Sequence, residues 1–108
     1  MKRIAYSAIV EKVRELCVLA NTQLPPDVVV SLQAALKKEV SEHARAALEQ
    51  CIQNAAIAQN EQVPICQDTG FAVYSVEMGT GVVVEGGLIT DAIQEGTGRG
   101  YRDGRLRQ

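Results

Sequence analysis

Tryptophan is absent from this 108-residue sequence, and phenylalanine and histidine occur once each. Long apolar runs are absent too, whereas a membrane-spanning helix needs about 20 consecutive apolar residues. Charged residues interrupt the N-terminal stretch MKRIAYSAIVEKVREL, so it lacks the continuous apolar core of a signal peptide. These absences predict a protein without a membrane segment and with a cytoplasmic location.

A strong excess of either charge is also missing. The formal net charge is −2, and hydrophobic and charged residues make up 46% and 22% of the chain, as in ordinary globular proteins. A surface that binds phosphate groups needs concentrated Lys and Arg, so the composition predicts no nucleic-acid partner. At this length we expect one domain that covers residues 1–108.

The three cysteines are scattered, with no CxxC motif and no Cys-His pair. An odd number of cysteines argues against a disulfide framework, and the missing pairs argue against a zinc site of ordinary spacing. Cys17 and Cys51 stand in helical patterns, which predicts that both fill core positions as small hydrophobic residues. His43 follows a predicted helix start among polar residues, and we expect it to be solvated.

Apolar residues recur at helical intervals in the first part of the chain and predict three helices, over about 5–20, 27–40 and 42–59. Ser41 is placed to cap the third of these, because its hydroxyl can accept a hydrogen bond from a free N–H of the first turn.

A β-rich stretch over about 71–78 and an apolar run over about 82–85 predict a short β hairpin or strands. A fourth helix is expected over about 90–102, although each glycine inside it costs about 1 kcal/mol. The glycines of GTGRG, residues 96–100, lack the pattern of a nucleotide-binding loop, which indicates turns and close packing instead. Helices followed by strands indicate an α+β fold.

The stretch PICQDTG, residues 64–70, brings a thiol, an amide, a carboxylate and a hydroxyl into one turn. Pro64 disfavours helix in the preceding residue, and Gly70 can adopt a positive φ, so the thiol lies on a bend. Four side chains could then converge on one ligand: those of Cys66, Gln67, Asp68 and Thr69. A structural loop with an Asx turn explains the same spacing, and spacing alone does not separate the two interpretations.

The longer stretch NAAIAQNEQVPICQDTGFAVYSVEMG, residues 54–79, resembles the N-terminal part of the alpha subunit, or alpha region, of class I iron-sulfur fumarate hydratases. It is similar to tartrate dehydratases as well. DAIQEGTGRGYRDGRLRQ, residues 91–108, resembles the helix and Leu-Arg pair that follow in that family. With the opening helices the likeness covers nearly the entire chain. It implies that residues 1–108 are the N-terminal fragment of a larger alpha subunit.

In that family three cysteines hold a [4Fe-4S] cluster, and one iron stays open to the hydroxyl and a carboxylate of the substrate. The resemblance implies that Cys66 is one cluster ligand and that Arg107 binds a carboxylate of the dicarboxylate substrate. Gln67, Asp68 and Thr69 are implied to bind the substrate, with Asp68 also catalytic. The implied reaction is the reversible hydration of fumarate to (S)-malate, a step of the tricarboxylic acid cycle.

The resemblance also implies partners, because the two other cluster ligands and the proton-abstracting residue match nothing in this sequence. We expect a beta subunit or C-terminal region, a homo- or hetero-oligomer, and no activity of the fragment alone. Preference for fumarate, tartrate or mesaconate stays open. A noncatalytic helical interaction or assembly module stays open as well, and an occluded Cys66 and an exposed apolar patch between helices, used for a partner chain, would indicate it. Cys66 and Arg107 facing one cleft would instead indicate the enzyme.

Overall fold

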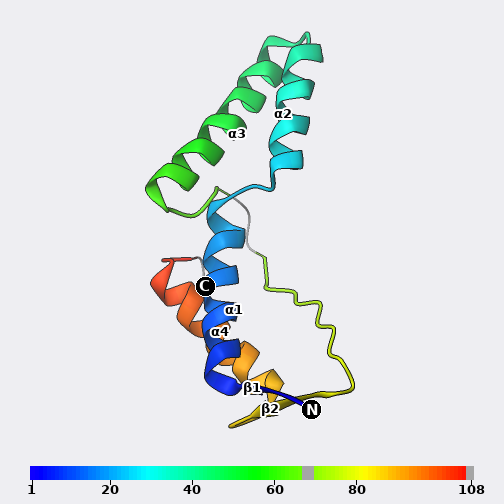
Figure 1. The fold of residues 1–108 in the computed structure, drawn as a ribbon. Helices are drawn as coiled ribbons and strands as arrows, with labels where there is room; N and C mark the ends of the chain where they lie inside the picture. The colour runs from blue at the N-terminus through cyan, green and yellow to red at the C-terminus, as the bar shows by residue number, and fades with distance from the viewer. Residues whose placement is uncertain (67–69, 107–108) are drawn as a thin grey trace. The chain divides into compact units, whose positions relative to one another are not determined.

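The computed structural model describes residues 1–66 and 70–106, which fall into two compact units. The first unit consists of residues 1–19 and the described part of 68–108, and the second of residues 20–66. The elements in order are β1 (Lys2–Ala5), α1 (Tyr6–Thr22), α2 (Pro26–Lys38), α3 (Glu42–Glu61), β2 (Val82–Glu85) and α4 (Ile89–Asp103) (Figure 1). Helices with one small sheet confirm the α+β prediction. The single domain over residues 1–108 stays a prediction.

All four predicted helices are confirmed, and their ends differ from the predicted ones by at most two residues. The cap at Ser41 is confirmed as well, because its Oγ accepts a hydrogen bond from the Ala44 N–H at 3.4 Å. Within residues 1–66 and 70–106, none of the helices has both the length and the apolar character that crossing a membrane requires.

The sheet of the first unit has two strands, and they run parallel. Its register pairs Lys2 with Val82 and Ile4 with Val84, and Ile4 and Val84 are both half-buried. The strand over 82–85 is thus confirmed, but the predicted β hairpin is wrong. Residues 70–79 form no strand, and β2 pairs with β1 instead.

The hairpin prediction failed because β propensity reports how well side chains suit a pleated surface and does not choose the partner strand. Here the two partners are 80 residues apart in register, from Lys2 to Val82, and local periodicity carries no signal for such a pairing. Parallel strands need a long crossover connection, and here the connection from β1 to β2 contains α1, α2 and α3.

The core of the first unit lies where α1 packs against α4. A Cβ atom at Gly96 would lie 2.6 Å from the Val10 carbonyl oxygen, and one at Gly100 would lie 2.7 Å from Cys17 Cβ. The two glycines therefore allow an approach that no larger residue permits, which confirms the close-packing prediction. Val13, Cys17 and Leu106 form the buried cluster beside them, so the predicted burial of Cys17 is also confirmed.

The second unit contains the antiparallel pair of α2 and α3 (Figure 1). Arg45 of α3 donates from Nη1 to the carbonyl oxygens of Leu36 and Glu39, at 2.7 and 3.1 Å. Those carbonyls stand at the C-terminal end of α2, where intrahelical partners run out and positive charge is favourable. The Arg45 guanidinium therefore satisfies carbonyl groups at the C-terminal end of α2, although Arg45 itself belongs to α3.

Candidate functional site

The segment that carries Cys66 begins where α3 ends. Gln62 follows Glu61 with φ of 55°, in the left-handed region, and its N–H donates to the Ala58 carbonyl oxygen. The Val63 N–H donates to the same oxygen at 3.1 Å, so the last turn of the helix is closed. The left-handed conformation of Gln62 is the C-cap of α3.

Two hydrogen bonds hold the backbone after Pro64. The Ile65 N–H donates to the Asn21 carbonyl oxygen, in the last turn of α1, at 2.7 Å. The Cys66 N–H donates to Oδ1 of Asn54, on α3, at 2.9 Å. All of these residues belong to the second unit, and the Cys66 residue itself is exposed. Two hydrogen bonds therefore hold the backbone at residues 65 and 66, and Cys66 is exposed.

The other two cysteines differ from Cys66 and from each other. Cys17 is buried, and its Sγ lies 3.0 Å from Tyr74 Oη. Cys51 is exposed on α3, so its predicted role as a core filler is wrong. A pair of helices covers only a narrow stripe of each partner, and on α3 Ile52 and Ala55 lie on that stripe. His43 is exposed, as predicted.

Thiolate is the form of cysteine that binds iron, so a cluster ligand must be reachable and free to lose its proton. Cys66 fits one position of an iron-sulfur cluster on this ground, since it is exposed and lies outside any helix. In the part of the chain that the structure describes, no group of three or more His, Cys, Asp or Glu side chains could hold a metal ion.

The remaining predicted site residues lie outside the described residues: Gln67, Asp68, Thr69 and Arg107. Their roles stay predictions. The leucine of the Leu-Arg pair is described, and it belongs to the core of the first unit. Leu106 is buried, and its N–H donates to the Tyr101 carbonyl oxygen at 2.9 Å, after a turn in which Arg105 has φ of 55°.

A hydrogen-bonded chain of side chains holds the segment 70–79 to the core of the first unit. Tyr74 Oη lies 3.0 Å from Cys17 Sγ and 2.5 Å from Thr97 Oγ1. Thr97 donates its one hydroxyl hydrogen to the Ile93 carbonyl oxygen at 2.7 Å, so the Tyr74 hydroxyl donates to Thr97. Burial raises the pKa of Tyr74 above its ordinary value. No sequence pattern distinguished Tyr74, a tyrosine within a β-rich stretch.

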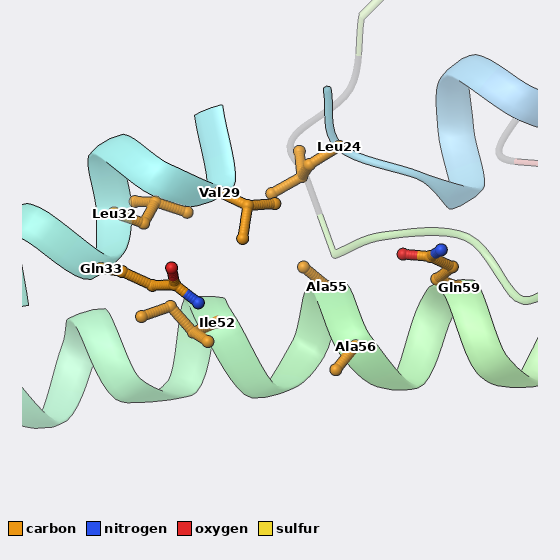
Figure 2. Close-up of a pocket in the computed structure, with 8 residues that line it drawn as sticks. All are labelled: Leu24, Val29, Leu32, Gln33, Ile52, Ala55, Ala56 and Gln59. Carbon is orange, nitrogen blue, oxygen red and sulfur yellow. The ribbon is translucent and has the colours of Figure 1, made fainter. Parts of the chain in front are cut away.

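A groove of about 170 Å³ lies between α2 and α3 in the second unit. Figure 2 shows Val29 and Leu32 of α2 facing Ile52 and Ala55 of α3, with Leu24 at one end. Its lining is apolar apart from two glutamines and includes no ionisable side chain. The groove therefore offers neither acid-base chemistry nor a charged partner for a carboxylate.

A match to a known protein family extends over both Cys66 and α4. The family model described as fumarate hydratase (fumerase) matches residues 10–108. A protein of Methanocaldococcus jannaschii named "Putative L(+)-tartrate dehydratase subunit alpha" is 40% identical over 74 residues, which are 68% of this chain and 25% of that protein. The match thus spans a quarter of the relative's length. The chain belongs to the fumarate hydratase (fumerase) family.

Proposed function

We propose that this chain is the N-terminal part of the alpha component of an iron-sulfur-dependent hydro-lyase. The reaction adds the hydroxyl group and a proton of water across the double bond of fumarate and forms (S)-malate, reversibly. The observation that supports the proposal is the exposed Cys66, whose N–H is held by Asn54, inside the region that the family model matches.

In this proposal Cys66 holds one iron of a [4Fe-4S] cluster, and further segments of the complete enzyme supply the other ligands. The bound cluster supplies a Lewis acid at the substrate's hydroxyl group. Arg107 binds a substrate carboxylate, because a guanidinium group offers two parallel N–H donors that match its two oxygens.

Gln67 and Thr69 orient the same substrate through hydrogen bonds, and Asp68 holds a proton close to it as the catalytic residue of this chain. Four residues of one short stretch thus act on one small molecule. The proton at the carbon next to the carboxylate is exchanged by a residue of the beta component.

The dehydration of tartrate is the second candidate, and the name of the Methanocaldococcus jannaschii relative favours it. Tartrate and malate are both hydroxylated dicarboxylates, so a guanidinium group and a cluster ligand serve either reaction. The noncatalytic assembly module is less well supported, because Cys66 is exposed rather than occluded.

Association with the rest of an alpha chain and with a beta component belongs to the same proposal, as does a cytoplasmic location. Exposed apolar side chains support the association, since Phe71 and Val73 are 89% and 83% exposed. The sheet supports it too, because two strands alone are marginal in water.

Anaerobic reconstitution with iron and sulfide tests the function. The 108-residue chain, alone and with the complementing alpha and beta segments, is assayed for fumarate hydration and for tartrate dehydration. We expect activity only in the complemented sample, and we expect Cys66→Ala to abolish it. Cys51→Ala is the matched control, because Cys51 is an exposed thiol on a helix. Full activity of Cys66→Ala would refute the ligand assignment.

A further inference from the structure

Asn54 contacts the candidate ligand residue from another element. It lies inside α3, is half-buried, and accepts the Cys66 N–H at 2.9 Å through its Oδ1 atom. Asparagine is a poor helix former in a helix interior, because its side chain competes for backbone hydrogen bonds. In α3 that side chain reaches instead to a residue 12 positions later in the chain.

This hydrogen bond controls how Cys66 is presented. The orientation of a backbone N–H fixes the plane of the peptide bond before Cys66, and the direction of its Cα–Cβ bond follows from that plane and φ. The Ile65 N–H is bonded to the Asn21 carbonyl oxygen at 2.7 Å, so the preceding peptide plane is held as well. Consecutive peptide planes are thus tied to two different helices, α1 and α3, within the second unit.

A metal ligand needs such support because an exposed side chain on a loop is otherwise free to point in several directions. Sites whose ligands are orientated by a second layer of hydrogen bonds bind metal about 10- to 100-fold better than sites without it. Cys66 is exposed, so side-chain packing contributes little to its orientation. The backbone hydrogen bond to Asn54 therefore carries that task.

We propose that Asn54 is a positioning residue for the Cys66 thiol, which it holds in one orientation for iron. The role rests on the proposed function, in which Cys66 is a cluster ligand. It requires an acceptor oxygen at the reach of the Asn54 side chain. Aspartate, which has the same size and an oxygen in the same place, satisfies that requirement, and alanine does not.

The hydrogen bond is tested in the 108-residue chain by amide hydrogen exchange at Cys66. Asn54→Ala should speed the exchange of this amide about tenfold, and Asn54→Asp should leave it within about threefold of the unmodified chain. Asn60→Ala, at an exposed position of the same helix, is the control and should change nothing. Unchanged exchange at Ile65 in Asn54→Ala identifies a local effect. An unchanged Cys66 amide in Asn54→Ala overturns the proposal.

The consequence for the ligand is tested in the complemented assembly by the iron bound per chain after dialysis against a chelator. Asn54→Ala should lower the apparent iron affinity about tenfold or more, and Asn54→Asp should restore it. Iron retention by Cys66→Ala would overturn the proposed function, whatever the Asn54 variants do. Loss of iron in Cys66→Ala with undiminished retention in Asn54→Ala would overturn only the positioning role.

Discussion

At the residue scale, the hydroxyl of Tyr74 joins the extended segment 70–79 to both helices of the first unit's core. It contacts Cys17 of α1 and Thr97 of α4, and these hydrogen bonds tie down a segment that pairs with no strand among residues 1–66 and 70–106. The same residue follows the stretch 67–69 that carries the predicted substrate ligands. Tyr74 therefore anchors the chain five positions after that stretch.

Removal of this hydroxyl gives the first stability prediction. Tyr74→Phe keeps the ring and removes the hydrogen bonds to Cys17 and Thr97, so the free energy of unfolding should fall by about 1 kcal/mol. Urea denaturation measures it. Tyr101→Phe is the control, because Tyr101 also packs against the buried cluster, and it should change the value much less. Equal losses in both variants would contradict the role of the Tyr74 hydroxyl.

Tyr74→Phe also tests how the free energy of unfolding depends on pH. The folded chain raises the pKa of Tyr74 above its ordinary value of 10.0, so the folded state holds the phenol proton more tightly than the unfolded state does. The stabilisation is then fully present below pH 10.0 and is lost as the pH rises through the folded pKa. Above that pH the unmodified chain should lose more stability than Tyr74→Phe, as urea denaturation at several pH values measures.

The bend at Cys66 shows how far reasoning from single residues extends. Pro64 restricts the backbone of the preceding residue, which was enough to predict that Cys66 lies outside a helix. The acceptor at Asn54 was not predictable, since it lies 12 residues away on a helix whose end had first to turn back at Gln62. The exposure of Cys51 was missed for a similar reason, because exposure depends on which stripe of α3 another helix covers.

At the scale of the element, α4 is a helix whose glycines have two different environments. A Cβ atom at Gly96 would come within 2.6 Å of Val10 backbone and of Val13 Cβ, neither of which is the flexible end of a side chain. At Gly98 the nearest atom to a Cβ would be Arg102 Nη1 at 3.5 Å, an ordinary contact. The two positions therefore respond in opposite directions to the same substitution.

Gly98→Ala should raise the free energy of unfolding by about 0.5–1 kcal/mol, because alanine favours helix over glycine. Gly96→Ala gains the same propensity but forces α1 and α4 apart at a cost of about 1–3 kcal/mol, so it should be net destabilising. Urea denaturation of the two variants measures both signs. Stabilisation by Gly96→Ala would show that the helices do not pack as closely as the structure has them.

The helices were predictable from the sequence because their apolar positions repeat every three or four residues and their ends carry local signals such as Ser41. The apolar residues of 71–78 have β propensity, yet that segment pairs with no strand in the described residues. Its neighbour β2 found its partner at Lys2–Ala5, a four-residue strand directly before a helix. Pairing between distant segments depends on tertiary structure, which propensity does not contain.

At the scale of the whole molecule, apolar surface on the segment 70–79 is the feature that stands out. Phe71 and Val73 are 89% and 83% exposed, and Val76 and Met78 are exposed as well. Exposed apolar side chains gathered in one short segment form a candidate interaction surface. The chain also matches only 25% of its Methanocaldococcus jannaschii relative, so a complete protein of that kind contains much more polypeptide.

We expect the isolated chain to associate as its concentration rises, and Phe71→Ser with Val73→Ser to weaken the association about tenfold or more, because each change removes a large apolar side chain from the contact. Sedimentation velocity over a concentration series measures the strength of this association. Val40→Ser is the matched control, since Val40 is 91% exposed in the turn between α2 and α3. Equal weakening by the control would show that the association is nonspecific.

Neither the local sequence nor the described part of the chain defines the whole candidate active site. Cys66 is described, whereas Gln67, Asp68, Thr69 and Arg107 lie outside the described residues. In the proposed function Cys66 and Arg107 serve one site, although they are 41 positions apart in the sequence and no local pattern links them. Single residues of a substrate site can be recognised in the sequence of one segment. Their arrangement around the substrate is defined only by the whole enzyme.

The central claim is that the thiol of Cys66 binds iron in the complete enzyme, and the iron and acid-labile sulfide content of the reconstituted, complemented assembly tests it most directly. We predict that Cys66→Ala loses bound iron and sulfide, whereas Cys51→Ala retains both at the level of the unmodified chain. Undiminished iron and sulfide in Cys66→Ala would contradict the account.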